Sequence, residues 1–268
     1  MLNAILFDEP VAGIQRITLN RPEAGNAFTF EMYDLLLERL EEIRRDLRVR
    51  AVILTGAGRA FCTGHDLRLS SSLPEEDQGL RGFYARKQFM ARLSRIPLSL
   101  RSLPQPVIAA VNGSVAGIGF ALSLCCDIAI AGRSAKFVNA IHNAGTGHEF
   151  GLSYLLPRQI GAQRAAELLL TMRPVLAEEA ERIGLVVRVS PDDQLMAAAL
   201  ELAQGVAANV PIGVMMTKQS LWLNQGAGSL EAAIEMEHRA VHIAQATEDA
   251  AEKRAAFAEK RPPDFKFA

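Results

Sequence analysis

The stretch "NGSVAGIGFALSLCCDIAIAG", residues 112–132, combines a glycine-rich turn with a long run of apolar side chains. Before it, "PVIAAV" at 106–111 has the composition of a buried strand, and "DIAIAG" at 127–132 predicts a second strand. The apolar residues between them predict a helix. Strands that alternate with helices indicate parallel strands joined by crossover helices, so the stretch predicts an α/β fold.

The same alternation extends toward the N-terminus. Residues 14–20, "IQRITLN", alternate as a half-buried strand does, and 50–56, "RAVILTG", form a short apolar run typical of a buried strand. Between them, apolar residues recur at helical spacing from Thr29 to Leu47, and Thr29 can cap that helix. The polar segment 70–80 predicts a loop, and an amphipathic segment follows to about Leu103.

The pattern changes after about residue 191. Helical segments are expected at 192–208, 211–225 and 229–259, with no strand between them. We therefore predict an α/β core over residues 1–190 that carries the functional site, and a helical region over 191–268.

Composition excludes several classes of function. Lys and Arg (29) nearly balance Asp and Glu (30), so the overall charge does not indicate a nucleic-acid partner. No apolar run reaches the roughly 18 residues of a membrane span, and we expect a soluble, cytoplasmic protein with no membrane partner. Cys62, Cys125 and Cys126 have no C-x-x-C spacing, so we expect small buried side chains rather than a disulfide or metal site.

Gly113, Gly117 and Gly119 follow one strand in a pattern similar to the turns that hold a dinucleotide pyrophosphate. No acidic residue follows at the distance of about 20 residues expected for a ribose contact, which weakens that interpretation. Peptide N–H groups at the start of an apolar helix still form a site for negative charge, either a phosphate or a developing oxyanion. Tight packing of the helix is the alternative explanation for the glycines.

A second glycine turn, "GRAFCTGHDL" at 58–67, directly follows the strand 50–56. Both turns leave the carboxyl ends of strands, where open α/β sheets place their ligands. Two such loops can direct two N–H groups at one oxygen.

Titratable side chains gather in "HNAGTGHEFG", residues 142–151, where His142, His148 and Glu149 are candidate acids or bases. An exposed polar loop is the alternative. His238 and His242 lie one helical turn apart, but Arg239 stands where the H-E-x-x-H zinc motif has glutamate. We therefore expect a solvated or subunit-contact face there, and no metal site.

Taken in order, these segments resemble the enoyl-CoA hydratase/isomerase family, also called the crotonase family. The resemblance runs through "ITLNRPEAGNAF", "GAGRAFCTGHDL", "PQPVIAAVNGSVAGIGFALSLCCDIAIAG", "GLSYLLPRQIGAQRAAELLLT", "AERIGLVVRV" and "AFAEKRPPDF". It implies a crotonase-like spiral of ββα repeats with a C-terminal helical trimerisation region. It also implies a homo-trimer or a dimer of trimers.

The resemblance implies an oxyanion hole for the thioester carbonyl of an acyl-CoA, built from two main-chain N–H groups. By position these belong to His65 and Ile118, next to Gly64 and Gly117, and the side chain of His65 need not be catalytic. Each such donor can lower a barrier by about 3 kcal/mol.

The chain departs from the family's hydratases at their two glutamates, whose positions hold Ala121 and Ile141. Neither side chain can transfer a proton. The family's isomerases often place one Asp or Glu in the turn that begins the following helix, and Glu149 stands there. The resemblance therefore favours isomerisation of a 3-enoyl-CoA to a 2-enoyl-CoA with Glu149 as the single base.

Binding of CoA is implied along a second set of positions. The resemblance assigns contacts with pantetheine and adenine to the backbone around Ala24, Thr63, His65, Asp66 and Leu67. Lys260, from the same or a neighbouring subunit, is a candidate phosphate contact, whereas Glu23 stands where many relatives have lysine. Asp66 can equally fix its own turn. No cofactor is expected, since coenzyme A is carried by the substrate.

Three alternatives stay open at this point. One is an enoyl-CoA hydratase with a rebuilt site, which would use Glu149 together with His142 or His148. Another is a catalytically weak acyl-CoA binding protein. The third is a dinucleotide-dependent reductase. The sequence does not specify the length of the acyl chain.

Overall fold

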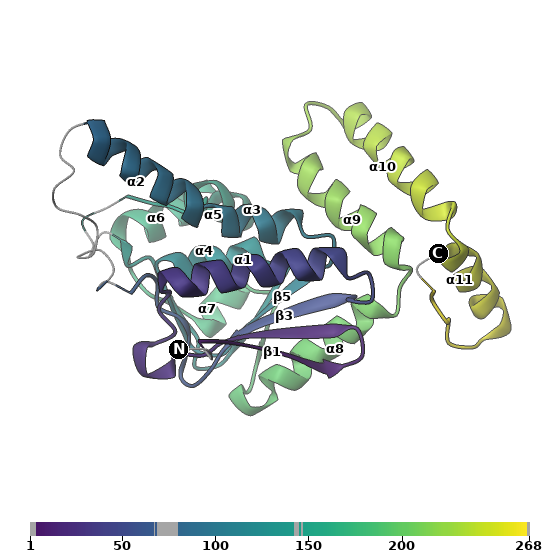
Figure 1. The fold of residues 1–268 in the computed structure, drawn as a ribbon, viewed down its shortest axis with the longest axis horizontal. Coiled ribbons are helices and arrows are strands. Elements are labelled where there is room, and N and C mark those ends of the chain that lie inside the picture. Colours follow the sequence, from purple (N-terminus) through teal and green to yellow (C-terminus); the bar gives the residue numbers. More distant parts are fainter. Residues whose placement is uncertain (1–3, 67, 69–79, 142–144, 146, 267–268) are drawn as a thin grey trace.

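The computed structural model describes residues 4–66, 68, 80–141, 145 and 147–266 (Figure 1). The strands of this part are β1 (Ile5–Val11), β2 (Ile14–Leu19), β3 (Ala51–Gly56), β4 (Ala60–Cys62), β5 (Val107–Val111), β6 (Ser114–Ala116), β7 (Ile128–Gly132), β8 (Lys136–Val138), β9 (Val175–Leu176) and β10 (Arg188–Ser190). Its α-helices are α1 (Phe30–Arg45), α2 (Leu80–Leu93), α3 (Arg95–Ser102), α4 (Ile118–Cys125), α5 (Leu152–Ile160), α6 (Ala162–Thr171), α7 (Ala177–Arg182), α8 (Leu195–Ala207), α9 (Pro211–Leu223), α10 (Leu230–Gln245) and α11 (Glu248–Glu259).

Within these residues the strands form two sheets. The larger has the order β1-β2-β3-β5-β7-β10, and the smaller has the order β4-β6-β8-β9. In the larger sheet β1 is antiparallel to β2, and the pairs from β2 through β10 are parallel. The pairs β3-β4, β5-β6 and β7-β8 each give their first strand to the larger sheet and their second to the smaller one. The predicted α/β fold with parallel strands, ββα units and a helical C-terminal region is confirmed.

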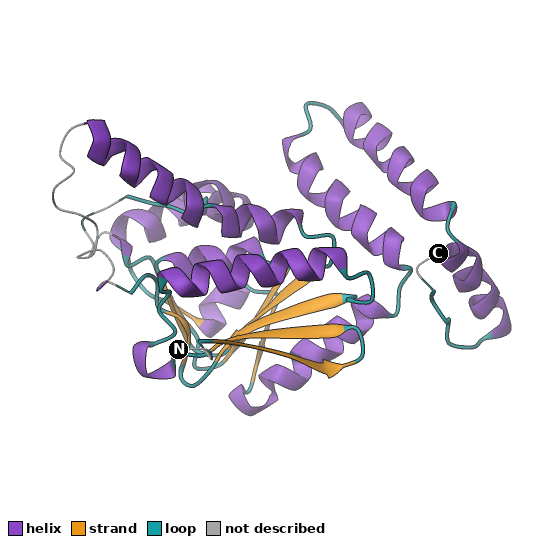
Figure 2. Cartoon of the chain, in the orientation of Figure 1, coloured by secondary structure: helices purple, strands orange, loops and turns teal. Residues whose placement is uncertain are grey.

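Side chains of the central strands point alternately to the two faces of the sheet, so the interior has two cores, one on each face. In β3, Val52 and Leu54 face the core that contains α1, whereas Ala51 and Ile53 face α8. Both faces are therefore covered by helices, α1 on one side and α8 on the other (Figure 2). Each fully buried Leu or Ile contributes about 1.5–3 kcal/mol, so strands buried on both faces dominate the stability of the sheet.

Helix α1 forms as the sequence predicts, with Thr29 as its N-cap. The Thr29 side chain accepts a hydrogen bond from the N–H of Met32, and the buried face includes Leu36 and Leu40. The helix ends at Arg45 rather than at Leu47. Asp46 follows in an extended conformation and donates its N–H back to the last turn, which closes the helix early.

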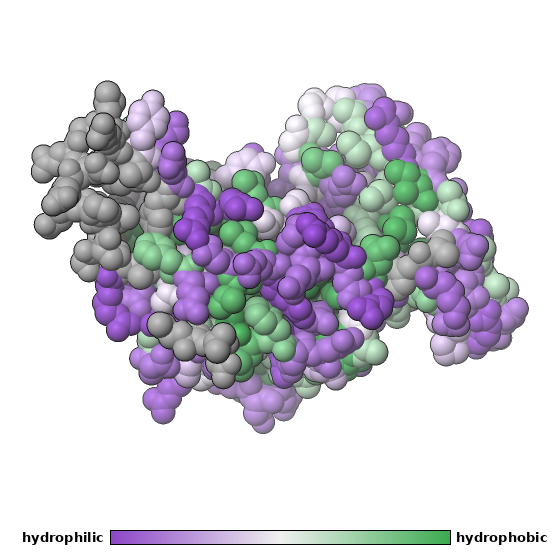
Figure 3. Space-filling view, in the orientation of Figure 1, coloured by the Kyte–Doolittle hydropathy of each residue, from purple (hydrophilic) through white to green (hydrophobic). Residues whose placement is uncertain are grey.

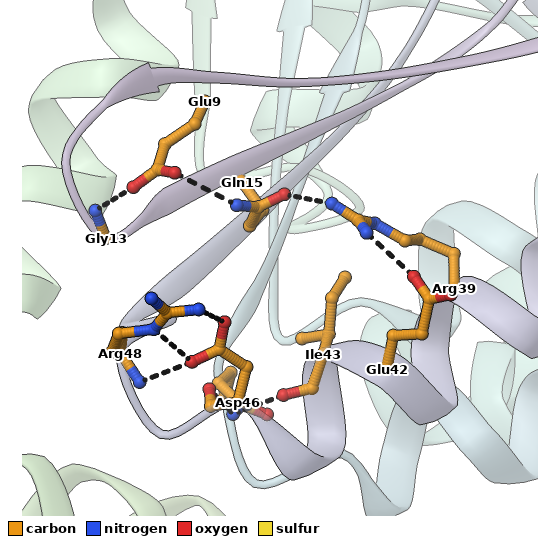
Figure 4. A network of polar contacts seen from close by, with 9 residues as sticks. Glu9, Gly13, Gln15, Arg39, Glu42, Ile43, Asp46 and Arg48 are labelled. Carbon is orange, nitrogen blue, oxygen red and sulfur yellow. Dashed lines mark hydrogen bonds and ion pairs between the residues drawn. The ribbon is translucent and has the colours of Figure 1, made fainter.

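A polar network on the surface joins the β1–β2 hairpin to α1 (Figure 4). Glu9 accepts hydrogen bonds from the N–H of Gly13 (2.6 Å) and from the side chain of Gln15 (3.4 Å). Arg39 then donates to Gln15 (2.6 Å) and pairs with Glu42 (2.8 Å). Exposed pairs of this kind contribute at most about 1 kcal/mol each, so the network orients the hairpin more than it stabilises it.

Three expectations about the elements need correction. The segment after residue 80 is two helices, α2 and α3, rather than one continuous element. The glycine turn leads first into the short strand β6 and only then into α4. The last helical segment is divided into α10 and α11, because Thr247 caps a new helix by accepting a hydrogen bond from the N–H of Ala250. The predicted loop 70–80 lies outside the described residues except for Leu80, which begins α2.

The helical C-terminal region has two parts. Helix α8 packs on the sheet through Leu195, Ala199 and Ala203, while α9 and α10 form an antiparallel pair that extends away from it (Figure 1). The division into domains at residue 190 stays a prediction. No single helix in the described part of the chain is long and apolar enough to cross a membrane, and the bent pair 192–207 and 211–226 meets that criterion only when counted together.

A buried ion pair fastens α9 to the core. The Lys218 ammonium lies 2.7 Å from the Asp127 carboxylate, and their side chains are only 5% and 9% exposed. Asp127 also accepts hydrogen bonds from the indole N–H of Trp222 (2.6 Å) and from the N–H of Val107 (2.7 Å). Burial lowers the pKa of Lys218, and the negative charge of Asp127 opposes that change. The ion pair therefore holds α9 against the segment just before β7.

Candidate active site

The glycines of the opening stretch bring two backbone segments into direct contact. A Cβ atom on Gly113 would lie 2.1 Å from the carbonyl oxygen of Arg59, and one on Gly119 would lie 2.1 Å from that of Cys62. Any larger side chain would force the segments apart. The beginning of α4 is thus packed against the strand β4 and the turn before it.

This contact places Gly64 beside Gly117. Both have positive φ values, +111° and +53°, and a Cβ on Gly117 would lie 3.6 Å from Cα of Gly64. A Cβ on Gly64 would lie 4.0 Å from the backbone nitrogen of Ile118. The peptides that carry the N–H groups of His65 and Ile118 are therefore neighbours.

Neither N–H group donates to a protein acceptor within the described residues. Ile118 is the first residue of α4, so its N–H also lies at the positive end of the helix dipole. Two free donors on adjacent peptides form a site for an oxygen that gains negative charge during a reaction.

Two asparagines, the buried Asn26 and the half-buried Asn112, hold the turn that precedes β4. The side-chain amides of Asn26 and Asn112 both donate to the carbonyl of Ala60, at 2.6 Å and 3.2 Å. Asn26 donates as well to Ala57, and Asn112 accepts from the N–H of Gly56. Neither residue was predicted from the sequence. The signal was available, since each is a polar residue within an apolar segment next to a glycine.

The positions assigned to CoA lie together along one edge of this turn. The N–H of Thr63 donates to the carbonyl of Gly25 (3.0 Å), and that of Phe28 donates to the carbonyl of Gly64 (2.8 Å). Ala24, Thr63 and Gly64 are therefore adjacent in space. Leu67 lies outside the described residues.

The side chain of Asp66 has a structural role. It is buried and forms ion pairs with Arg21 (3.0 Å) and Arg68 (2.6 Å). Hydrogen bonds from Arg68 and then Arg21 hold the pKa of this carboxyl far below its ordinary value. Arg21 also donates to the carbonyl of Ala27, so Asp66 fixes its own turn against the segment 21–27.

Glu149 lies in a turn that requires an unusual backbone. Phe150 and Gly151, which follow it, both have positive φ values (56° and 76°), and the N–H of Leu152 donates to the carbonyl of Glu149. Two consecutive positive φ values are those of a mirror-image turn, which glycine adopts without strain and phenylalanine does not. The buried ring of Phe150, 4% exposed, anchors this conformation.

The turn directs Glu149 at the side chain of His65. The Glu149 carboxylate Oε1 lies 3.1 Å from His65 Nε2, and the two side chains are 17% and 25% exposed. The hydroxyl of Tyr33, a residue of α1 that is 1% exposed, lies 2.7 Å from His65 Nδ1 and 3.4 Å from Nε2, so Nδ1 is its closer partner. From the sequence, neither the side chain of His65 nor Tyr33 was predicted to belong to the site.

Other predicted residues are placed as follows. Ala121 and Ile141, at the positions of the hydratase glutamates, are both buried. His148 is half-buried next to Glu149, and His142 lies outside the described residues. Lys260 is exposed at the end of α11, and that helix lies at the opposite end of the molecule from the N-terminus of α2 (Figure 1).

The histidines and the cysteine that were considered as metal or thiol sites are not arranged for such chemistry. His238 and His242 are exposed on α10. In the part of the chain that the structure describes, no group of three or more His, Cys, Asp or Glu side chains is arranged to hold a metal ion. Burial raises the pKa of Cys62 to about 12, so this thiol stays protonated beside the glycine turns.

The family profile described as enoyl-CoA hydratase/isomerase matches residues 9–267. The chain belongs to this family. A probable enoyl-CoA hydratase, echA12, of Mycobacterium bovis is 44% identical over 266 residues, which cover 98% of this chain and 93% of the relative. The solved structure of a probable enoyl-CoA hydratase/isomerase from Mycobacterium abscessus is similar with a TM-score of 0.88, at 38% identity and covering 98% of this chain and 99% of that one.

A monofunctional enoyl-CoA isomerase from M. smegmatis has a TM-score of 0.72 and 42% identity, covering 86% of this chain and 98% of that one. The crotonase-like fold expected from the resemblance is therefore confirmed. The family is one of acyl-CoA enzymes, and both hydratases and isomerases are named among these relatives.

Proposed function

We propose that this enoyl-CoA hydratase/isomerase family member moves a double bond, converting a 3-enoyl-CoA to a 2-enoyl-CoA. One observation carries the proposal. The Glu149 carboxylate lies against the side chain of His65, and the main-chain N–H of this histidine lies at the paired glycine turns. A base and an oxyanion site are thereby adjacent, which is what abstraction of a proton beside a thioester requires.

The reaction follows from these groups. The Glu149 carboxylate removes a proton from C2, and the electron pair of that C–H bond moves toward the thioester oxygen. The N–H groups of His65 and Ile118 stabilise the negative charge there, each by about 3 kcal/mol. The protonated carboxyl then gives its proton to C4, and the double bond between C3 and C4 moves to C2 and C3. Nothing is oxidised or reduced, so the proposed reaction needs no cofactor.

Neither of the two positions that hold glutamate in the family's hydratases has a carboxylate here, which supports isomerisation over hydration. Addition of water requires two groups that hold and deprotonate it, and Ala121 and Ile141 can do neither. The imidazole of His65 is nearby, but its Nε2 faces Glu149 itself. The side chains present therefore suit transfer of a single proton within one substrate.

Hydration is the second candidate, because the relative echA12 is named a probable enoyl-CoA hydratase. That reaction would use Glu149 with a nearby histidine such as His148, which is half-buried beside it. A weak acyl-CoA binding protein would retain the oxyanion site with little turnover.

Parallel assays of 3-enoyl and 2-enoyl thioesters separate these functions. We expect Glu149→Gln to lower the rate of isomerisation by about 10²- to 10⁴-fold, the usual contribution of a general base. Glu201→Gln, which changes an exposed glutamate of α8, is the matched control and should leave the rate unchanged. Hydration that survives Glu149→Gln would contradict the assignment of the base. Tight binding of CoA thioesters without either reaction would favour the binding protein.

We also propose that the chain works as a trimer or as a dimer of trimers, in which Lys260 reaches a phosphate of CoA bound to a neighbouring copy. In a single chain α10 has no buried residue, and Leu230, Val241 and Ile243 are 71%, 48% and 53% exposed. Apolar side chains are visible over α9 and α10 (Figure 3). Covering such a surface is favourable, which supports assembly through these helices.

A further inference from the structure

Three segments that are distant in sequence meet in one chain of close polar contacts. Tyr33 comes from α1, His65 from the loop after β4, and Glu149 from the turn before α5. The Tyr33 hydroxyl lies 2.7 Å from Nδ1 of His65, and Nε2 of the same ring lies 3.1 Å from Oε1 of Glu149. The proposed reaction uses only the carboxylate and the main chain, so it leaves the His65 and Tyr33 side chains without a role.

We propose that the His65 side chain is a positioning residue for Glu149, and that Tyr33 holds the imidazole in the required protonation form. The proposal rests on the proposed function, in which Glu149 is the base. Residue 65 would then contribute twice, through its main-chain N–H to the thioester oxygen and through its side chain to the base.

The contacts restrict which nitrogen of His65 carries a proton. A neutral ring with its proton on Nδ1 would turn the lone pair of Nε2 toward the Glu149 carboxylate, which is repulsive. Burial raises the pKa of Tyr33 well above its ordinary value, so the phenol keeps its proton. A protonated phenol can donate that proton to Nδ1, and Nε2–H is then directed at the carboxylate.

The result is a carboxylate held at one oxygen. Oε1 of Glu149 lies 3.1 Å from His65 Nε2, and the described residues make no ion pair or hydrogen bond with Oε2. Oε2 is therefore the oxygen available to take the proton of the substrate. The ring of Phe150 packs edge-on against His65 with centroids 6.0 Å apart, which limits rotation of the imidazole.

Residue 65 also links the two halves of the site. Its backbone position is fixed by the neighbouring hydrogen bond from Phe28 to Gly64, and its side chain fixes Glu149. The separation of base and oxyanion site thus depends on the conformation of one residue. Misplacement of a reacting group by about 1 Å can lower a rate by about 10²-fold, so the effect of losing this contact is measurable.

Two substitutions of matched size test the contact. His65→Gln keeps a nitrogen donor at the place of Nε2, whereas His65→Asn keeps polar atoms only near Nδ1 and does not reach Glu149. Both retain the main-chain N–H. We expect His65→Asn to lower kcat for isomerisation by about 10- to 100-fold with KM within about twofold of wild type, and His65→Gln to restore most of the rate.

Tyr33→Phe keeps the buried ring but removes the hydroxyl that faces Nδ1. We expect a smaller loss of kcat than in His65→Asn, again with little change in KM, because the imidazole stays in place but its protonation form is no longer fixed. Thermal unfolding of each variant, compared with wild type, separates a positioning effect from a loss of folding.

Glu149→Gln in the same assay distinguishes failure of this inference from failure of the proposed function. If Glu149→Gln abolishes isomerisation but both His65 variants turn over like wild type, the positioning role is wrong and the base assignment stands. Equal losses in His65→Gln and His65→Asn would also overturn the inference, since the donor at Nε2 would then be irrelevant. If Glu149→Gln itself retains full isomerisation, the proposed function fails first.

Discussion

Helices α4 and α10 differ completely in their burial. All eight residues of α4 are buried, whereas none of the sixteen residues of α10 is buried in the single chain. Helix α4 packs against α3, α5 and the strands β4 and β6, and its first residue supplies a donor of the proposed oxyanion site. Helix α10 contacts mainly α9, and a groove of about 690 Å³ runs along that contact.

The difference in burial indicates that the two helices have different roles. Positioning of backbone N–H groups to a fraction of an ångström requires a rigid surrounding, which dense packing on every side provides. A helix with exposed apolar side chains contributes little to such precision, but it offers a surface for another chain. Substitutions in α4 should therefore affect folding and the site, whereas substitutions in α10 should affect assembly.

The largest effect is expected for Gly119→Ala in α4. The added methyl carbon would lie 2.1 Å from the backbone carbonyl of Cys62, so α4 would have to move away from β4. Overpacking of a core usually costs about 1–3 kcal/mol, and contact with a backbone atom leaves no side chain that can yield. We expect the free energy of unfolding in urea to fall by at least the upper part of this range, or soluble expression to be lost.

Gly205→Ala in α8 is the matched control for this test. Nothing lies within 4 Å of the position of its added carbon, and the residue is exposed. Since alanine favours helix over glycine, we expect stabilisation by about 0.5–1 kcal/mol. Equal stability of Gly119→Ala and wild type would show that the packing around α4 is looser than the structure indicates.

The sequence predicts the central elements because each carries its own local signal. The apolar runs 51–56 and 107–111 are strands, and the cap at Thr29 marks the start of α1. The short strands β4, β6, β8, β9 and β10 were missed, since segments of two or three residues have no periodicity that a sequence pattern can display. The seven-residue strand β1 was also missed, because only Ile5 in it is buried and its side chains do not alternate regularly.

The candidate site was predictable only in part, for a related reason. The turns around Gly64, Gly117 and Glu149 are marked by glycines and by the family resemblance. The contact of His65 with Tyr33 and Glu149 depends on how three distant segments meet, and no local pattern encodes that. The polar character of these residues suggested chemistry, but their arrangement required the fold.

The second prediction tests the pair of glycine turns that α4 helps to form. Gly64→Ala would place a methyl carbon 3.5 Å from the carbonyl of Ala116 and 4.0 Å from the nitrogen of Ile118, at a φ of +111°. We expect the N–H of His65 to be displaced, and kcat for isomerisation to fall by about 10²- to 10³-fold, as when one oxyanion donor is lost. Steady-state kinetics with a 3-enoyl thioester measure the effect.

Gly161→Ala serves as the control for backbone strain. Gly161 has a comparable φ of +84°, with nothing within 4 Å of an added carbon. Its substitution should lower stability without a matching loss of kcat. Similar kinetics for both variants would mean that the main-chain donors do not act in the reaction.

The smallest effect on the single chain is expected in α10. Val241 is 48% exposed and lines the groove beside α9, so Val241→Glu removes little buried surface and keeps a residue that favours helix. Far-ultraviolet circular dichroism should therefore be unchanged. If α10 is covered by a second copy, however, the new carboxylate would be buried without a partner, which is costly, and the assembly should dissociate.

Sedimentation equilibrium should then show a trimer or hexamer for wild type and a lower mass for Val241→Glu. Gln204→Glu on the exposed face of α8 is the control and should retain the wild-type mass. A Val241→Glu protein with the full wild-type mass would place the interface elsewhere, because an unpaired charge is not tolerated in the centre of an apolar contact. Helix α10 would then be exposed to solvent in the working enzyme as well as in the single chain.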